Sequence, residues 1–206
     1  MKNKATDRAM ETLHRQGEML QRAAKQLGEE FDKAARIVSK CEGAVYTVGF
    51  GKSGTVCAKL AATLRSAGKK SLMLNPVDAL HGEMACVRQD DIAIVVSSTG
   101  ESDEIMRIVP WLQKKKVKII ALTPSDRSSL ARASNVLLRT HPPADAADGC
   151  ASYSACLSAL AIGDLLCLGI LYSQDIEHGR GPAAEQPPGE AIYTVADLIS
   201  LRPANP

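Results

Sequence analysis

The sequence has 206 residues, of which 45% are apolar, and this length and composition suit a single globular domain with a buried core. The 25 Lys and Arg residues are scattered among 23 Asp and Glu residues, so the formal net charge is only +2 and no basic surface for nucleic acid is indicated. The residues after the first methionine are polar and no apolar run reaches the ~20 residues of a membrane span, so we expect a cytoplasmic protein that binds neither nucleic acid nor a membrane.

The first predicted elements are helices. Residues 5–40 repeat apolar side chains every three or four positions, with an interruption near Gly28, which is typical of two helices or of one kinked helix. Five short runs follow that are rich in β-branched residues, and each has the composition of a buried strand. These runs are residues 44–50, 71–74, 92–98, 117–123 and 135–139. Helical segments are predicted between them at 54–67, 101–114 and 127–133.

Strands that alternate with helices predict an α/β fold with a parallel sheet. The strands are continuously apolar because such a sheet is covered on both faces. A last helix is expected over residues 150–173, and its many Ala, Leu, Ser and Gly residues suit close packing, including against a second copy of the chain. We divide the chain into an N-terminal helical segment (1–40), a central domain (41–176) and an irregular Gly- and Pro-rich tail with one short helix (177–206).

The six cysteines include no CxxC pair and have no histidines at metal-binding spacing. Several of them lie in apolar helical patterns. We therefore expect reduced thiols rather than a disulfide framework or a zinc site.

The first candidate binding turn reads GFGKSGT over residues 49–55. Ligands of open parallel sheets bind where strands end and helices begin, which is the predicted place of this turn. Its glycines permit close backbone approach, and Ser53 together with the amides of the next helix suits an anion. The alternative is a turn that serves packing alone, since the spacing matches neither a dinucleotide fingerprint nor a Walker phosphate loop.

The second candidate turn reads SSTGES over residues 97–102. Its hydroxyls and the amides around Gly100 form a donor cluster that can hold phosphate oxygens. The alternative is that a hydroxyl only caps the next helix, with Glu101 and Glu104 in its first turn, where the helix dipole favours acids. Capping alone does not explain why Glu104 follows Glu101 by three residues, a spacing that predicts roughly the same helical face for both. A run of hydroxyls beside a carboxylate favours a site that grips a phosphate while Glu104 moves protons on the attached sugar. The candidate phosphate ligands in the two turns are Gly51, Ser53, Ser97, Ser98, Thr99 and Ser102.

These motifs in combination resemble the sugar isomerase (SIS) domain family, and within it the arabinose 5-phosphate isomerases. The resemblance covers about residues 40–175 and rests on VGFGKSG, NPVDALHGEM, SSTGESDEI, SSLARASNV and IGDLL. It implies a three-layer αβα sandwich with a five-stranded parallel sheet, of the flavodoxin-like and Rossmann-like kind. It also implies a homodimer or homotetramer with the site between subunits, and isomerisation of a sugar phosphate without a cofactor.

The resemblance gives catalytic roles to Lys52, His81 and Glu104. Lys52 would neutralise the enediolate or the phosphate, Glu104 would shuttle the proton, and His81 would open the sugar ring, from the same or another subunit. Each residue also has a plainer interpretation: a solvated loop amine, a first-turn helix acid and a surface histidine.

The sequence departs from the family pattern at several positions. The family's second glutamate corresponds to Asp145, which is one methylene shorter, and the hydroxyl cluster that opens the last helix leaves Ser152 and Ser154 as phosphate donors. Gln186 stands where the family has a late histidine, and an amide cannot exchange protons near neutral pH. Asn75 replaces a histidine that contacts metal in the family, so no metal site is expected. We also expect no CBS modules, which follow the SIS domain in many relatives.

The resulting hypothesis is an isomerase that interconverts D-arabinose 5-phosphate and D-ribulose 5-phosphate through an enediol. The alternative is a non-catalytic sugar-phosphate-binding or regulatory protein that kept the phosphate loops and lost proton-transfer groups. The sequence leaves the identity of the sugar open, because the side chains that read its length and stereochemistry are not evident from spacing.

Overall fold

The computed structural model describes residues 4–141 and 151–177 of the chain. The strands are β1 (Val45–Val48), β2 (Ser71–Leu74), β3 (Ile92–Val96), β4 (Lys118–Thr123) and β5 (Val136–Arg139). The helices are α1 (Lys4–Lys25), α2 (Glu29–Ser39), α3 (Lys52–Ser66), α4 (Pro76–Ala79), α5 (Asp103–Lys114), α6 (Ser129–Ala133) and α7 (Ala151–Glu177), with a 3₁₀ turn η1 (Glu83–Cys86).

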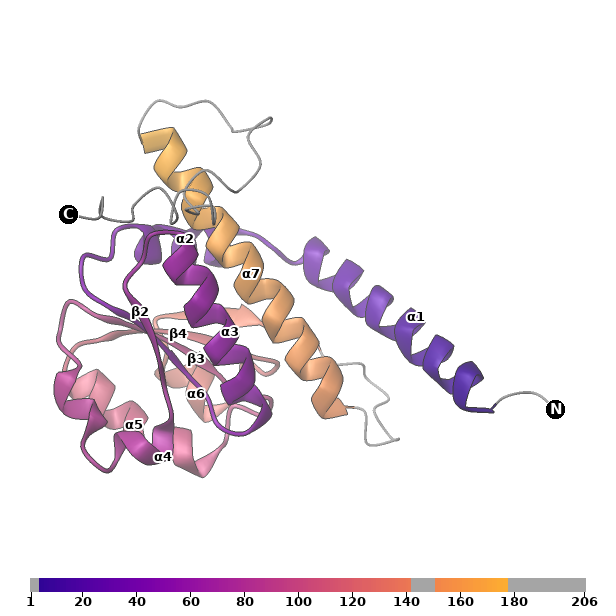
Figure 1. Cartoon of the computed structure of the whole chain (residues 1–206), viewed down its shortest axis with the longest axis horizontal. Coiled ribbons are helices and arrows are strands. Elements are labelled where there is room, and N and C mark those ends of the chain that lie inside the picture. The colour runs from indigo at the N-terminus through magenta and orange to yellow at the C-terminus, as the bar shows by residue number, and fades with distance from the viewer. Residues whose placement is uncertain (1–3, 142–150, 178–206) are drawn as a thin grey trace, which may run out of the picture.

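The five strands form one parallel sheet in the order β2-β1-β3-β4-β5. Helices α2, α3 and α7 pack together on one face, and α4, α5 and α6 cover the other (Figure 1). The predicted α/β sandwich is thereby confirmed. In this strand order the connections from β1 and from β3 leave toward opposite sides, and ligands of such sheets bind at the carboxyl ends of the strands beside that switch point.

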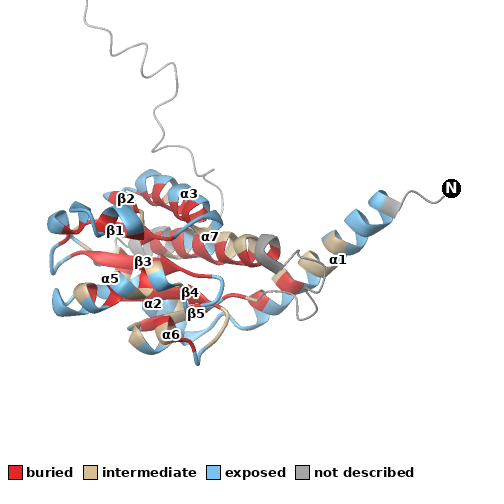
Figure 2. Cartoon of the chain, turned by 90° about the horizontal axis from the view of Figure 1, so that it is seen from below, coloured by how far each residue is buried: buried red, intermediate tan, exposed pale blue. Residues whose placement is uncertain are grey.

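The central strands are buried on both faces, as their continuous apolar sequence predicts (Figure 2). Along β3, Ile92, Ile94 and Val96 enter the core beneath α2, α3 and α7. Ala93 and Val95 enter the core on the α5 side. Apolar cores therefore pack on both faces of the sheet. Because they hold the strands in place, the loops at the edges of the sheet start from fixed positions.

The observed elements refine the predicted ones at their ends. The N-terminal segment forms two helices, and Gly28 is the residue that precedes α2. β3 ends at Val96, so residues 97 and 98, which were predicted to be strand, lie in the following loop. α4 and η1 were not predicted, since each has four residues and too few positions for a helical period. The predicted tail lies outside the described residues from 178 onward.

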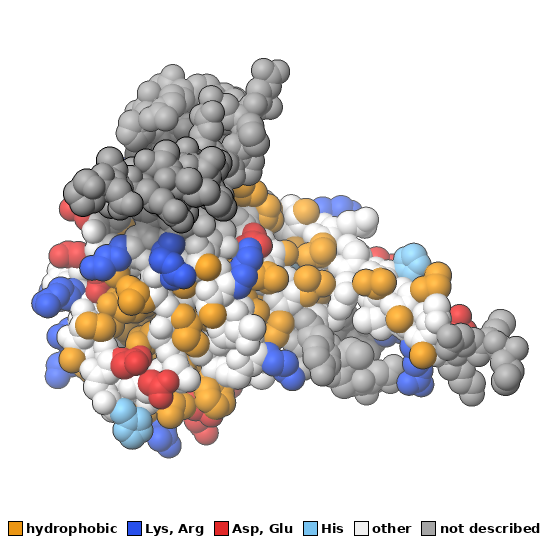
Figure 3. All heavy atoms as spheres, in the orientation of Figure 1, with side chains coloured by type: hydrophobic (Ala, Val, Ile, Leu, Met, Phe, Trp, Pro, Cys, Tyr) orange, Lys and Arg blue, Asp and Glu red, His pale blue; other side chains and the backbone are white. Residues whose placement is uncertain are grey.

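α1 extends from the body and contacts it mainly through α7 (Figure 1). Its side chains Met10 and Leu13 are exposed, as are Leu165 and Leu168 of α7. Hydrophobic side chains gather over these two helices on the face shown in Figure 3. None of the described helices has the length and hydropathy needed to cross a bilayer.

The cysteines in the described residues are free thiols. Cys57 and Cys167 are buried in the core, as expected for structural thiols, whereas Cys86 is exposed.

The amino-terminal edge of the sheet is held by a buried carboxylate. Asp91 precedes β3, and its two oxygens accept hydrogen bonds from the amide of Ala44 at 2.7 Å and from the amide of Arg88 at 2.6 Å. A Cβ on Gly43 would lie 2.6 Å from the same carboxylate, so the segment before β1 packs directly on it. Asp91 thus joins the starts of β1 and β3.

We predict that Asp91→Ala destabilises the protein by about 2–4 kcal/mol, because two amides would lose their acceptor at a site that is 7% exposed. The matched control is Asp90→Ala, whose side chain is exposed. Urea unfolding checks the difference; equal unfolding midpoints for the two variants would contradict this role of Asp91.

Candidate functional site

The candidate site lies at the carboxyl edge of the sheet, where the loops after β1 and β3 meet α7. A cavity of about 220 Å³ opens there. Its lining residues come from all three segments: Phe50, Lys52, Ser53, Val96, Ser98, Ser102, Ile105 and Cys156. The two turns that the sequence singled out therefore share one cavity, because parallel strands end at the same edge of their sheet.

The glycines of the first turn have separate tasks. Gly51 has a φ of 58° and immediately precedes α3, in a region of backbone conformation that glycine adopts without strain. A Cβ on Gly49 would lie 2.7 Å from Cys57 Sγ, so this glycine allows the strand to pack against α3. The turn serves packing and also delivers Lys52 and Ser53 to the cavity in the first turn of α3, whose amides favour an anion.

The hydroxyls of the second turn divide into two groups. Ser97 is buried, and its Oγ accepts from the amide of Gly100 at 2.9 Å and lies 3.1 Å from Ser102 Oγ. Thr99 Oγ1 accepts from the amide of Glu101 at 3.1 Å. Ser97 and Thr99 therefore shape the loop and do not line the cavity, whereas Ser98 and Ser102 do.

The expected side-chain cap of α5 is not formed. Ser102 occupies the N-cap position but makes no side-chain hydrogen bond to the helix. Its hydroxyl faces Ser97 and the cavity instead. The run of hydroxyls is therefore not accounted for by helix capping, which was the plainer interpretation of this sequence.

Glu101 fastens the second turn to α6. Its carboxylate accepts from the amide of Ser129 at 2.8 Å, and the Gly100 carbonyl accepts from the amide of Leu130 at 3.0 Å. Hydrogen bonds from Ser129, through its side chain and its backbone, hold the pKa of the Glu101 carboxyl below its usual range. The prediction that Glu101 shares a helical face with Glu104 is wrong: α5 begins at Asp103, and Glu101 turns away to the next helix.

Gly100 leaves no room for a side chain. Its φ is 73°, and a Cβ there would overlap the hydroxyl of Ser128 and lie 2.7 Å from Thr123 Oγ1. Because residue 100 is a glycine, the backbone of the turn can pack directly against the end of β4 and the start of α6.

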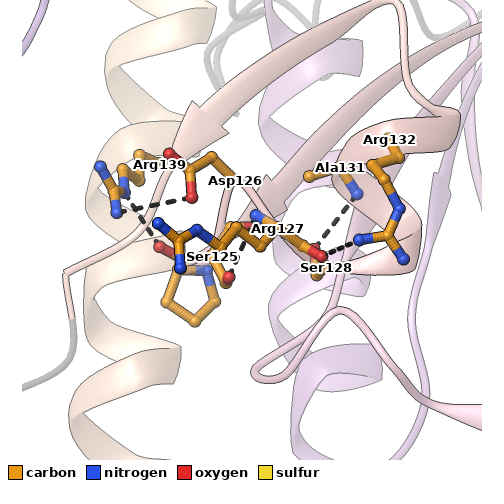
Figure 4. A network of polar contacts seen from close by, with 8 residues as sticks. Ser125, Asp126, Arg127, Ser128, Ala131, Arg132 and Arg139 are labelled. Carbon is orange, nitrogen blue, oxygen red and sulfur yellow. Dashed lines mark hydrogen bonds and ion pairs between the residues drawn. The ribbon is translucent and has the colours of Figure 1, made fainter.

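The α6 start, against which the turn rests, is itself held by a polar network (Figure 4). Ser128 Oγ caps α6 by accepting from the amide of Ala131 at 3.2 Å, and it donates to the Ser125 carbonyl at 2.8 Å. Arg139 at the end of β5 donates from Nε to the Pro124 carbonyl at 3.0 Å. The phosphate-loop candidate is therefore attached to a braced segment rather than to a free loop.

The predicted catalytic residues do not all reach the cavity in a single chain. Lys52 lines it. Glu104 is half-buried in the first turn of α5, and its neighbour Ile105 lines the cavity in its place. His81 is exposed between α4 and η1 and is not a lining residue, and Asp145 lies outside the described residues.

α7 contributes a residue that sequence reasoning missed. Ser154, a predicted phosphate donor, is 1% exposed and does not line the cavity, whereas Cys156 two residues later does. Burial raises the pKa of the Cys156 thiol, and the nearby positive charge of Lys52 opposes this shift. Phe50, Val96 and Ile105 supply an apolar wall that the polar motifs did not reveal. Among the described residues, no group of three or more His, Cys, Asp or Glu side chains is placed to hold a metal ion.

Residues 38–169 match the sequence profile of the SIS domain. The chain belongs to the SIS domain family. It is 33% identical over 163 residues to arabinose 5-phosphate isomerase KpsF of Escherichia coli, in a match that covers 78% of this chain and 51% of that protein. It is also 33% identical over 171 residues to arabinose 5-phosphate isomerase KdsD of Francisella tularensis, with 81% and 52% covered. The chain spans about half the length of the curated relatives it matches.

A solved structure is similar to this chain in fold. The structure of an Escherichia coli CFT073 protein in complex with A5P superposes with a TM-score of 0.77 at 27% identity, covering 98% of this chain and 100% of that one. The predicted family and its fold are therefore both confirmed.

We predict that Glu101→Gln lowers stability at neutral pH, because an amide accepts more weakly than a carboxylate from Ser129. Since the folded-state pKa is lowered from 4.5, the carboxylate's contribution is fully present above that value and is lost as the pH falls through the lowered one. Wild type and variant should differ in urea midpoint at about pH 7, and the difference should shrink as the pH falls below 4.5 and through the lowered pKa of Glu101. Glu18→Gln on the exposed part of α1 is the control. A difference between wild type and Glu101→Gln that persists undiminished in acid would contradict this role of the Glu101 carboxylate.

Proposed function

We propose that the chain is an aldose–ketose isomerase that interconverts D-arabinose 5-phosphate and D-ribulose 5-phosphate. The observation that carries this proposal is the single cavity in which Lys52, Ser53, Ser98 and Ser102 meet at the switch point of an SIS sheet. The 33% identity to arabinose 5-phosphate isomerases supports this choice of sugar.

The phosphate would occupy the cavity itself. At about 220 Å³ the cavity is smaller than most small-molecule sites, which span roughly 300–1,000 Å³. The hydroxyls of Ser98 and Ser53 and the first amides of α3 would donate to the phosphate oxygens, with Lys52 balancing their charge. The carbon chain would then extend out of the cavity opening, past the first turn of α5.

In this reaction a base removes the proton from carbon 2 of the aldose, an enediol forms, and the proton is returned to carbon 1. We assign the base to Glu104, which follows the cavity-lining Ser102 by two residues and precedes the lining Ile105. Lys52 would stabilise the enediolate, and His81 would assist ring opening.

The assembly would complete the site. His81 is exposed and does not line the cavity of its own chain, so we propose that a homodimer or homotetramer brings the His81 of a second copy to it. The exposed apolar side chains of α1 and α7 supply a surface for such self-association.

A second candidate function is a sugar-phosphate-binding regulator without catalysis. It is favoured by one observation: Glu104 and His81 are not among the residues that line the cavity. Such a protein would keep the phosphate grip of Ser98 and Lys52 and leave the carbon chain unchanged.

Exchange with solvent separates the two functions. In deuterated water an isomerase must exchange the hydrogen on carbon 2 of arabinose 5-phosphate, which proton NMR follows directly. We expect exchange, and we expect Glu104→Gln to slow it by about 100-fold or more, the usual scale for a general base. Asp103→Asn, an exposed acid in the same helical turn, should leave the rate unchanged. A raised melting temperature with no exchange would identify the regulator instead.

Ser98 tests the phosphate grip. We expect Ser98→Ala to weaken arabinose 5-phosphate binding by about 10-fold or more, because a hydrogen bond to a charged group is lost. Binding of unphosphorylated arabinose should not change, and Ser66→Ala, on the exposed end of α3, should affect neither ligand. Calorimetric titration measures both affinities; an equal loss for both sugars would mean that Ser98 acts on the fold rather than on the phosphate.

A further inference from the structure

A second cavity lies at the opposite edge of the sheet, where the strands begin. It is a groove of about 550 Å³ between α2 and the starts of β3 and β4. Its lining contains five cationic residues and three acidic ones, and the acids are Glu42, Asp90 and Asp91. The cations are Lys33, Arg36, Lys40, Lys116 and Lys118. This groove has no part in the function proposed above.

The cations approach the groove from two sides. Lys33 and Arg36 of α2 and Lys40, which follows its last residue, are spaced by three and four residues, so they lie along one side of that helix. Lys116 and Lys118 flank the start of β4. Lys118 is close enough to Cys41, at the α2 side, for its charge to oppose the rise that burial causes in the pKa of that thiol.

Most of these cations form no ion pair with another residue in the described part of the chain. Lys33 pairs with Glu30 at 3.4 Å, whereas no ion pair joins Arg36, Lys40, Lys116 or Lys118 to another described residue. Of the three groove acids, Asp91 already accepts hydrogen bonds from backbone amides with both of its carboxylate oxygens. These two hydrogen bonds fix the Asp91 side chain in the wall of the groove, and a preformed site loses less entropy when a ligand binds.

Helix dipoles alone would explain cations here, because α2 and α5 both end at this edge. The helix dipoles do not explain why a lysine stands at position 116, where the backbone is left-handed. This residue has a φ of 61° and occupies the left-handed position that closes α5, with its amide donating to the Gln113 carbonyl at 2.9 Å. α3 ends at the same edge with the same hydrogen-bond pattern, and there the position is taken by Gly68 at φ 78°. A lysine thus occupies a position where the backbone of a glycine would be unstrained, which points to a use for the lysine side chain.

We propose that this groove is a second anion-binding site, for a small molecule that carries at least two phosphate groups. Its volume lies in the range of small-molecule sites. Ile37, Ile92 and Cys41 supply an apolar surface beside the cations, which suits an organic part of such a ligand. The site is separate from the sugar-phosphate cavity, since the two lie at opposite edges of the sheet.

Inorganic pyrophosphate is the probe. Calorimetric titration at constant ionic strength should show saturable binding that saturating arabinose 5-phosphate does not displace. Arg36→Ala, Lys40→Ala and Lys116→Gly should each weaken binding by about tenfold, the effect of losing one charge-assisted contact. Lys25→Ala, at the exposed end of α1, is the control and should bind as wild type does.

Lys116→Gly separates binding from folding. Because glycine suits the left-handed position, this variant should melt no lower than wild type while it binds pyrophosphate more weakly. The proposal is overturned if pyrophosphate does not bind, if all three groove variants bind it as tightly as wild type, or if arabinose 5-phosphate displaces it. None of these results bears on isomerase activity, which the exchange measurement tests separately.

Discussion

The parallel pairing of β1 with β3 is the interaction on which the candidate site depends. Val45 pairs with Ile92 and Val48 with Val95, so the two strands end side by side and their loops enter helices at the same edge. Apolar layers on both faces hold this register, because a shift by one residue would exchange the side chains of the two cores. The position of Lys52 relative to Ser98 is thus set by hydrophobic burial some distance away from either polar group.

Within that frame, the turn after β3 shows how one short segment combines structure and binding. Ser97 and Thr99 satisfy backbone amides of their own loop, and Glu101 satisfies an amide of α6. These bonds leave Ser98 exposed at the cavity. A buried polar group without a partner is costly, so the hydroxyls that hold the loop are as necessary as the one that faces a ligand.

The two edges of the sheet differ in their chemistry because strands and helices run in opposite directions through the layers. Helices begin at the carboxyl edge, where their amides favour a phosphate, and end at the amino edge, where their carbonyls favour cations. The lysine and arginine at the end of α2 follow this rule. The rule does not require a lysine at the left-handed backbone position of residue 116. A single fold therefore presents anion-attracting groups at both edges, from amides at one and from side chains at the other.

The sequence by itself determined the α/β class, the strand cores, the break at Gly28 and the two polar turns, because these depend on local periodicity and on glycine and hydroxyl chemistry. The tertiary structure decided which residues face the cavity. Ser97 and Ser98 are adjacent and chemically alike, yet one is buried and the other lines the site, since the contacts of Gly100 with β4 and α6 set the rotation of the loop. Cys156 takes the place expected for Ser154 because the rotation of α7 is governed by its packing on α2 and α3. Side-chain direction in loops and helix rotation both depend on contacts between residues far apart in the chain, and no local pattern encodes them.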